Sequence, residues 1–117
     1  MAARRREIDG IVLFDVSGEY FGGPETEALD RAIAKEIALG NLRLVLNLSE
    51  CRAMNSTAFG VLLGAHRVCQ AIGGVIKLCG AERRMKNLLS VLHVNQLLDH
   101  YPSEGDALAA FAHRATA

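Results

Sequence analysis

Apolar positions near the middle of the chain form a near-continuous run that is too short for a helix of its own. Residues 42–48 carry five Leu and Val side chains, and the polar residues Ser49, Glu50 and Arg52 end the run. Such a run is typical of a central strand that is covered on both faces of a sheet. A second apolar run begins at Ala58, directly after three residues whose side chains can cap a helix. Residues 43–64 therefore predict a buried strand, a polar loop and a helix that begins within residues 55–57.

Turn signals predict the structure before this segment. Asp9-Gly10 separates the largely charged residues 4–8 from the apolar run 11–16, and favours a tight hairpin between the two segments because both turn positions must accept positive φ. Residues 17–23 predict a flexible connection with two exposed aromatic side chains, Tyr20 and Phe21.

Apolar stripes at helical spacing predict three further helices. They cover residues 24–39, where Pro24 suits the first helical position, residues 81–91, and the segment after Pro102-Ser103. Residues 75–79 and 97–101 predict short strands. Strands separated by helices call for right-handed crossovers onto parallel strand pairs, and the initial hairpin adds an antiparallel edge. The sequence therefore predicts an α/β fold with a mixed sheet.

The helix after residues 55–57 has two apolar faces. One face holds Ala58, Leu62, Ala65, Cys69 and Ile72. The other begins beside Ser56 and holds Phe59, Leu63, His66 and Gln70. Two such faces indicate either a deeply buried helix or one core face and one partner face, and the pattern leaves both interpretations open.

Composition bounds the class of protein. The 117 residues suit a single domain spanning 1–117, and half of them are apolar, which is enough for a core. Thirteen basic and thirteen acidic residues cancel, so no overall field attracts nucleic acid or an anionic membrane. No apolar run approaches the length that crosses a bilayer, and residues 1–6 lack the apolar stretch of a secretory signal. We expect a cytoplasmic protein without direct membrane insertion.

The residues that carry chemistry do not assemble an active site in the sequence. The glycines lack the spacing of a phosphate-binding loop, and the histidines and cysteines lack metal-ligand spacing. Cys51 is the one candidate nucleophile, and a small redox or thiol-transfer enzyme is the corresponding alternative. We expect a binding or switch module, with no catalysis, metal or cofactor. The hydroxyl of Ser56 is the most distinctive group, because a helix N-terminus tolerates an added phosphate.

The chain resembles the STAS domains, a family that includes anti-sigma factor antagonists and the cytoplasmic tails of sulphate transporters. The specific part of the resemblance is Met54-Asn55-Ser56-Thr57-Ala58-Phe59-Gly60, where the family carries an Asp-Ser-Ser/Thr-Gly-like motif that opens a helix. Residues 10–19 and 44–49, and Gly73-Gly74 before a strand, extend it over nearly the whole chain. The resemblance implies a STAS-like fold with a four- to five-stranded mixed sheet and about four helices packed mainly on one side.

The resemblance also implies a function. In antagonists, the serine that aligns with Ser56 is phosphorylated by the anti-sigma factor, which is an ATP-dependent serine kinase, and Thr57 is the alternative acceptor here. Phosphate adds about −1.5 to −2 charges at neutral pH, which disrupts a packed interface. The expected partner-binding residues lie at the start of the helix and along its second face: Asn55, Ser56, Thr57, Phe59, Leu63 and His66.

Three residues depart from the family motif. Asn47 and Asn55 stand where the family usually has acids, and Ala58 stands where it usually has glycine. These changes leave the fold expectation intact and remove two negative charges near the hydroxyl. They fit the alternative function, a STAS subunit of an ABC-type lipid transporter that binds the ATPase subunit without phosphorylation.

Overall fold

The chain begins with the hairpin that its sequence predicts. In the computed structural model, which describes residues 3–115, strands β1 (Ala3–Ile8) and β2 (Ile11–Val16) pair antiparallel. The turn residues Asp9 and Gly10 have φ of 51° and 77°. Both values are positive, as a tight hairpin turn requires.

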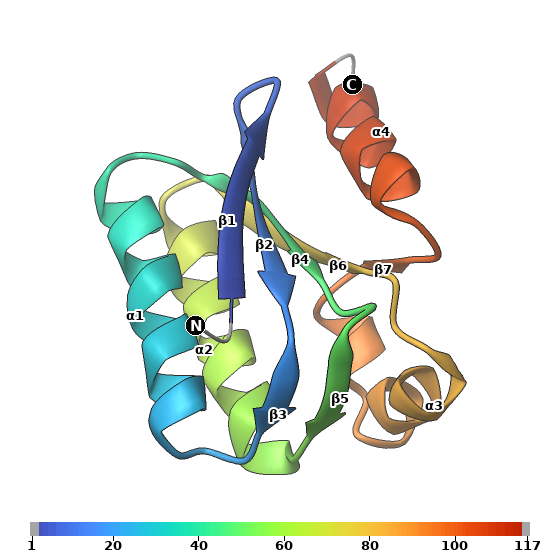
Figure 1. Ribbon diagram of the computed structural model, residues 1–117. Helices are drawn as coiled ribbons and strands as arrows, with labels where there is room; N and C mark the ends of the chain where they lie inside the picture. Colours follow the sequence, from blue (N-terminus) through green and yellow to red (C-terminus); the bar gives the residue numbers. More distant parts are fainter. Residues whose placement is uncertain (1–2, 116–117) are drawn as a thin grey trace.

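The remaining strands of the main sheet run parallel. Strand β2 pairs with β4 (Arg43–Asn47), β4 with β6 (Val75–Cys79), and β6 with the short β7 (His100–Tyr101). The strand order is β1-β2-β4-β6-β7, so within the described residues the sheet has five strands with one antiparallel edge (Figure 1). This confirms the predicted mixed sheet.

Helices cover both faces of the sheet unequally. Helices α1 (Pro24–Ala38) and α2 (Ser56–Ala71) lie side by side on one face, and α3 (Arg83–Val91) adds Met85 and Leu89 to the same core (Figure 1). A 3₁₀ helix, η1 (Val94–Gln96), follows α3. Helix α4 (Glu104–Ala115) packs on the opposite face, where Phe111 joins the second core with Val45. Three of the four α-helices in residues 3–115 thus contribute to one side, as expected.

Alternation along β4 explains how one strand serves two cores. Leu44 and Leu46 belong to the core under α1 and α2, whereas Val45 belongs to the core under α4. Successive strand side chains point to opposite faces, so a strand covered on both sides must be apolar throughout. That requirement accounts for the continuous apolar run in the sequence.

The predicted flexible connection is wrong over part of its length. Gly18–Tyr20 forms strand β3, which pairs in parallel with β5 (Cys51–Met54) as a separate two-stranded sheet. Tyr20 is fully buried and its hydroxyl donates to the carbonyl oxygen of Ser17 at 2.9 Å. Only Phe21 is exposed as expected, at 56%.

Candidate functional site

The start of α2 is fixed by the side chain of Asn55. Its Oδ1 accepts a hydrogen bond from the backbone N–H of Ala58 at 3.0 Å, while its own backbone is extended. This is the geometry of an N-cap, which satisfies one of the backbone donors left free at a helix start. The sequence prediction that the helix begins within residues 55–57 is confirmed.

Asn55 also joins the helix start to the loop between β3 and α1. Its Nδ2 donates to the carbonyl oxygen of Phe21 at 3.1 Å, and its backbone nitrogen donates to the carbonyl oxygen of Tyr20 at 3.1 Å. Gly22 then passes so close to Thr57 that an added Cβ would lie 2.8 Å from the threonine methyl carbon. Gly22 has a φ of +92°, which further favours glycine. The loop and the helix start therefore form one surface.

Ser56 and Thr57 are exposed on this surface. Ser56 is the first residue of α2, and the first turn of the helix contains no acidic side chain. The positive end of the helix dipole is thus not neutralised by a carboxylate in that turn, and an anionic group on either hydroxyl would be favourable there.

Two of the expected partner-binding residues are not on the surface. Phe59 is 1% exposed and His66 is 4% exposed, so the expectation of an exposed second face is wrong at both positions. Phe59 belongs to the main core, and His66 packs against β6, where its Nδ1 accepts the backbone N–H of Ile76 at 3.2 Å. Burial lowers the pKa of His66, which keeps the ring neutral and able to accept this bond. Leu63 is half-buried against the core.

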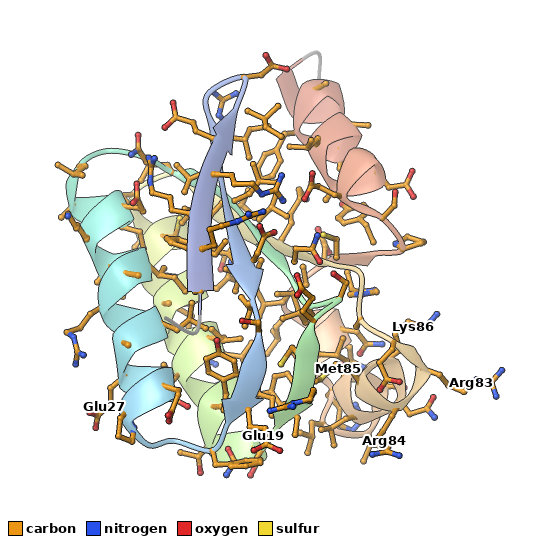
Figure 2. The ribbon with its side chains drawn as sticks, viewed as in Figure 1. Glu19, Glu27, Arg83, Arg84, Met85 and Lys86 are labelled. Atoms are coloured by element: carbon orange, nitrogen blue, oxygen red, sulfur yellow. The ribbon has the colours of Figure 1, made fainter. Side chains whose placement is uncertain are left out.

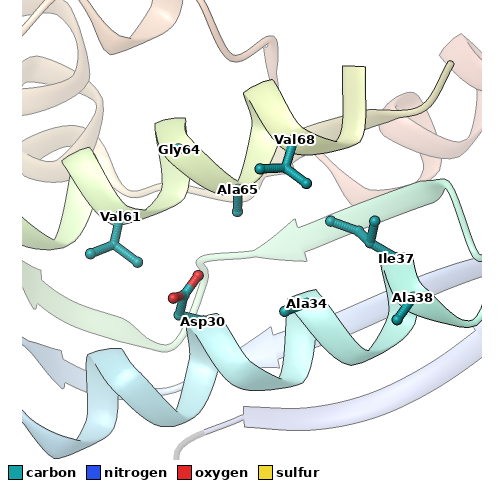
Figure 3. A pocket seen from close by; sticks show the side chains of 8 residues that line it. All are labelled: Asp30, Ala34, Ile37, Ala38, Val61, Gly64, Ala65 and Val68. Atoms are coloured by element: carbon teal, nitrogen blue, oxygen red, sulfur yellow. The ribbon is translucent and has the colours of Figure 1, made fainter. Parts of the chain in front are cut away.

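Solvent reaches a different side of α2. After the first turn of α2, the accessible residues include Leu63 and also Gly60, Val61, Gly64, Arg67 and Val68. Between this side and α1 runs an apolar groove of about 600 Å³, in which Asp30 is the charged lining residue (Figure 3). Ala34 and Ala38 lie one helical turn apart on α1 and face Gly64 of α2, and such small side chains leave a recess between two helices. This spacing is visible in the sequence and indicates a groove, which the sequence prediction above does not include.

Asn47 belongs to another part of the molecule. Its Oδ1 accepts the backbone N–H of Ser49 at 3.0 Å, and its Nδ2 donates to Glu104 of α4 at 3.2 Å. Glu104 and Asp15 also bind Arg6, and these contacts lower the pKa of both carboxyl groups. Asn47 thus helps to attach α4 to the sheet.

The thiol of Cys51 is poorly suited to catalysis. It is buried, its Sγ donates to the carbonyl oxygen of Ala53 at 3.6 Å, and burial raises its pKa to about 11. A reactive cysteine instead needs an electropositive setting that stabilises the thiolate. Within the part of the chain that the structure describes, no group of three or more histidine, cysteine or acidic side chains could hold a metal ion. None of the helices in residues 3–115 has the length and apolar character to span a membrane.

Comparison with known proteins identifies a family. The STAS domain model matches residues 2–107. A Thermotoga maritima protein described as a candidate anti-sigma factor antagonist superposes with a TM-score of 0.85 at 16% identity, covering 92% of each chain. The anti-sigma factor antagonist from Mycobacterium paratuberculosis gives 0.80 at 23% identity, covering 92% of this chain and 91% of that one. The murine anion transporter Solute Carrier 26 family member A9 gives 0.75 at 22% identity, and the match covers 93% of this chain but 18% of the transporter.

Proposed function

Because this chain belongs to the STAS domain family, we propose that it is an anti-sigma factor antagonist-like partner-switch protein. In this proposal it binds a serine-kinase anti-sigma factor in the bacterial cytoplasm, and phosphorylation of Ser56 prevents that binding. The protein regulates transcription by binding alone, without catalysis or a cofactor. Its fold likeness to anti-sigma factor antagonists supports this choice within the family.

The observation that carries the proposal is the exposed hydroxyl of Ser56 at the first position of a capped helix. A kinase can reach a side chain in this position without unfolding the helix. The added phosphate is tolerated by the helix N-terminus, so the free protein remains folded after modification. The same phosphate would bring a charge of about −1.5 to −2 into an interface packed against this surface.

The docking surface consists of Asn55, Ser56 and Thr57, together with the half-buried Leu63. Phe59 and His66 act behind it, as core residues that hold α2 against the sheet. Thr57 is the alternative phosphate acceptor, although its methyl carbon packs near Gly22. A hydroxyl with fewer packing constraints is easier to present to a kinase, which favours Ser56.

Affinity capture from the lysate of the native organism tests the proposal. Wild-type protein and Ser56→Asp are used as baits, with Ser90→Asp as a matched control on the exposed side of α3. We expect wild type and the control to recover a serine-kinase anti-sigma factor that Ser56→Asp loses. The recovered kinase should transfer phosphate to wild type and to Thr57→Ala, and not to Ser56→Ala. Equal capture by wild type and Ser56→Asp would contradict the proposal.

A second candidate is a STAS subunit of an ABC-type lipid transporter that binds the ATPase subunit without phosphorylation. The observation that favours it is Asn55, which provides the cap and the contact to Phe21 without the acidic charge usual in the motif. The fold is also shared with a domain-sized part of an anion transporter. Recovery of an ABC-type ATPase by both wild type and Ser56→Asp would support this candidate in place of the first.

A further inference from the structure

Two adjoining hollows lie where β5 meets α3. One has a volume of about 410 Å³ and the other about 130 Å³, and both are lined by Arg52, Glu82 and Arg84. Arg52 comes from β5 and Arg84 from the first turn of α3. Two segments distant in sequence thus bring two guanidinium groups to one recess.

Both arginines are available for a partner. They are exposed, and neither forms an ion pair with a carboxylate within residues 3–112. Glu82, which lines both hollows with them, already accepts the backbone N–H of Met85 at 3.3 Å as the cap of α3. Arg83 and Lys86 project from other sides of α3 into solvent and add to the positive charge of this helix (Figure 2). This local excess contrasts with a chain whose formal net charge is zero.

The smaller hollow has an apolar lining. Met54 and Met85 are each 3% exposed and line it together with Leu88, which is half-buried. Phe21 lines it as well and is 56% exposed. A volume of about 130 Å³ is below the range of about 300–1,000 Å³ in which small-molecule ligands bind. It suits one apolar side chain presented by a larger partner.

We propose that this recess is a docking site for an acidic segment of a protein partner. One apolar or aromatic side chain of the segment enters the smaller hollow, and carboxylates on either side of it pair with Arg52 and Arg84. Arginine forms bidentate hydrogen bonds with carboxylates, which would fix the position of the segment. Glu50 and Glu82 also line the larger hollow and repel any anion beside them, so the carboxylates of the segment must pair directly with the guanidinium groups. The methionine and leucine side chains of the smaller hollow suit an apolar side chain and not a phosphate, which favours a protein over a nucleic acid.

The recess adjoins the start of α2. The carbonyl oxygen of Phe21 accepts the side-chain amide of Asn55, which precedes Ser56. A partner that reaches Ser56 can therefore extend into the recess across Phe21. The inference rests on the proposed function only in taking the partner to be a protein, and it does not require that Ser56 is phosphorylated.

Selection of random peptides displayed on phage against the wild-type protein tests the inference. We expect enriched peptides that place aspartate or glutamate on both sides of an apolar or aromatic residue. The synthesised peptides should lose affinity by at least about tenfold for the double variant Arg52→Glu/Arg84→Glu, because like charges then face each other. They should bind the matched control Arg31→Glu/Arg67→Glu, which reverses two exposed arginines on α1 and α2, as wild type does. Affinity should also fall as salt is added.

The inference is overturned if no peptide is enriched, if the enriched peptides are not acidic, or if both double variants bind them equally. It is also overturned if a random oligonucleotide, and no acidic peptide, binds wild type and not the Arg52→Glu/Arg84→Glu variant. Should charge reversal prevent folding, Arg52→Gln/Arg84→Gln gives the same comparison with less perturbation. Failure here leaves the Ser56→Asp capture result untouched, so the two proposals fail separately.

Discussion

The ring of His66 accepts the backbone N–H of Ile76, with Nδ1 3.2 Å from the amide nitrogen. The ring of His100 likewise accepts the backbone N–H of Ala81, with Nε2 3.1 Å from the amide nitrogen. Both bonds need a neutral ring. Burial lowers the pKa of His66 and of His100 below the ordinary value of 6.5, as the loss of hydration of the charged form requires.

The first prediction is that stability falls between about pH 7.5 and pH 5. The unfolded chain binds a proton at each histidine at a higher pH than the folded chain does. The contribution of the two neutral rings is therefore complete above the unfolded pKa and is lost as the pH falls through the folded pKa values. Urea unfolding followed across this range measures the effect. A flat profile for wild type would contradict the prediction.

The second prediction concerns the cap of α2. Asn55→Ala removes both the bond to Ala58 and the bond to Phe21, and we expect it to lower the free energy of unfolding by about 1–2 kcal/mol. Asn55→Asp keeps an oxygen that can cap and should be less destabilising. Asn87→Ala, at an exposed position of α3, is the matched control and should change stability by less than about 0.5 kcal/mol. Urea denaturation measures the free energy of unfolding of each variant. Equal losses for Asn55→Ala and Asn87→Ala would show that the cap does not contribute to stability.

The third prediction is that the cysteines are unreactive in the native protein. All three are buried, and burial raises the pKa of Cys51 and of Cys79 to about 11. Alkylation by iodoacetamide near neutral pH should be slow until denaturant is added, and intact-mass spectrometry measures the number of modified thiols. Rapid labelling of one thiol, assigned by peptide mapping to Cys51, would restore the redox-enzyme alternative.

The fourth prediction compares two glycines. A Cβ at Gly74 would lie 2.6 Å from both Cys69 Sγ and the carbonyl oxygen of Leu42, whereas nothing lies within 4 Å of a Cβ at Gly64. We expect Gly74→Ala to destabilise by about 1–3 kcal/mol through overpacking. Gly64→Ala should stabilise by about 0.5–1 kcal/mol, because glycine inside a helix costs conformational entropy. Thermal unfolding measures the change in melting temperature of each variant relative to wild type. A change in the same direction for both variants would refute the packing argument.

The elements that the sequence predicts well are those with local causes. The turn at Asp9-Gly10 depends on two adjacent residues, and α2 begins where Asn55 can reach a backbone N–H three residues ahead. The capping bond from the backbone of Asp106 to Ser103 at 3.1 Å, at the start of α4, is equally local. Such features need no knowledge of what lies across the fold.

The features that the sequence did not predict depend on distant partners. Strand β3 has three residues, and its order depends on pairing with β5, whose residues lie more than thirty positions later. Four residues of the first predicted face of α2 are buried, namely Ala58, Leu62, Ala65 and Cys69, but Ile72 is 54% exposed. Periodicity does not show what covers the second face. Only the position of Ile76 on β6 reveals that His66 is an interior hydrogen-bond acceptor. The recess at Arg52 and Arg84 likewise exists only because β5 and α3 meet.

Besides the Arg6–Glu104 ion pair, the contact between α4 and the sheet contains a buried charged residue, Lys77 of β6, which is 3% exposed. Its ammonium group lies 3.2 Å from Asp99 and 3.1 Å from the Tyr101 hydroxyl, and 5.3 Å from the centre of the Phe111 ring. A purely apolar contact surface would allow the helix to shift by one turn with little loss of free energy. A buried cation, in contrast, finds its hydrogen-bonding partners in only a few arrangements. We therefore expect Lys77 to favour one alignment of α4 through its contact with the Phe111 ring, in addition to the Arg6–Glu104 ion pair. Replacement by methionine should leave a helix that is held as firmly but positioned less uniquely.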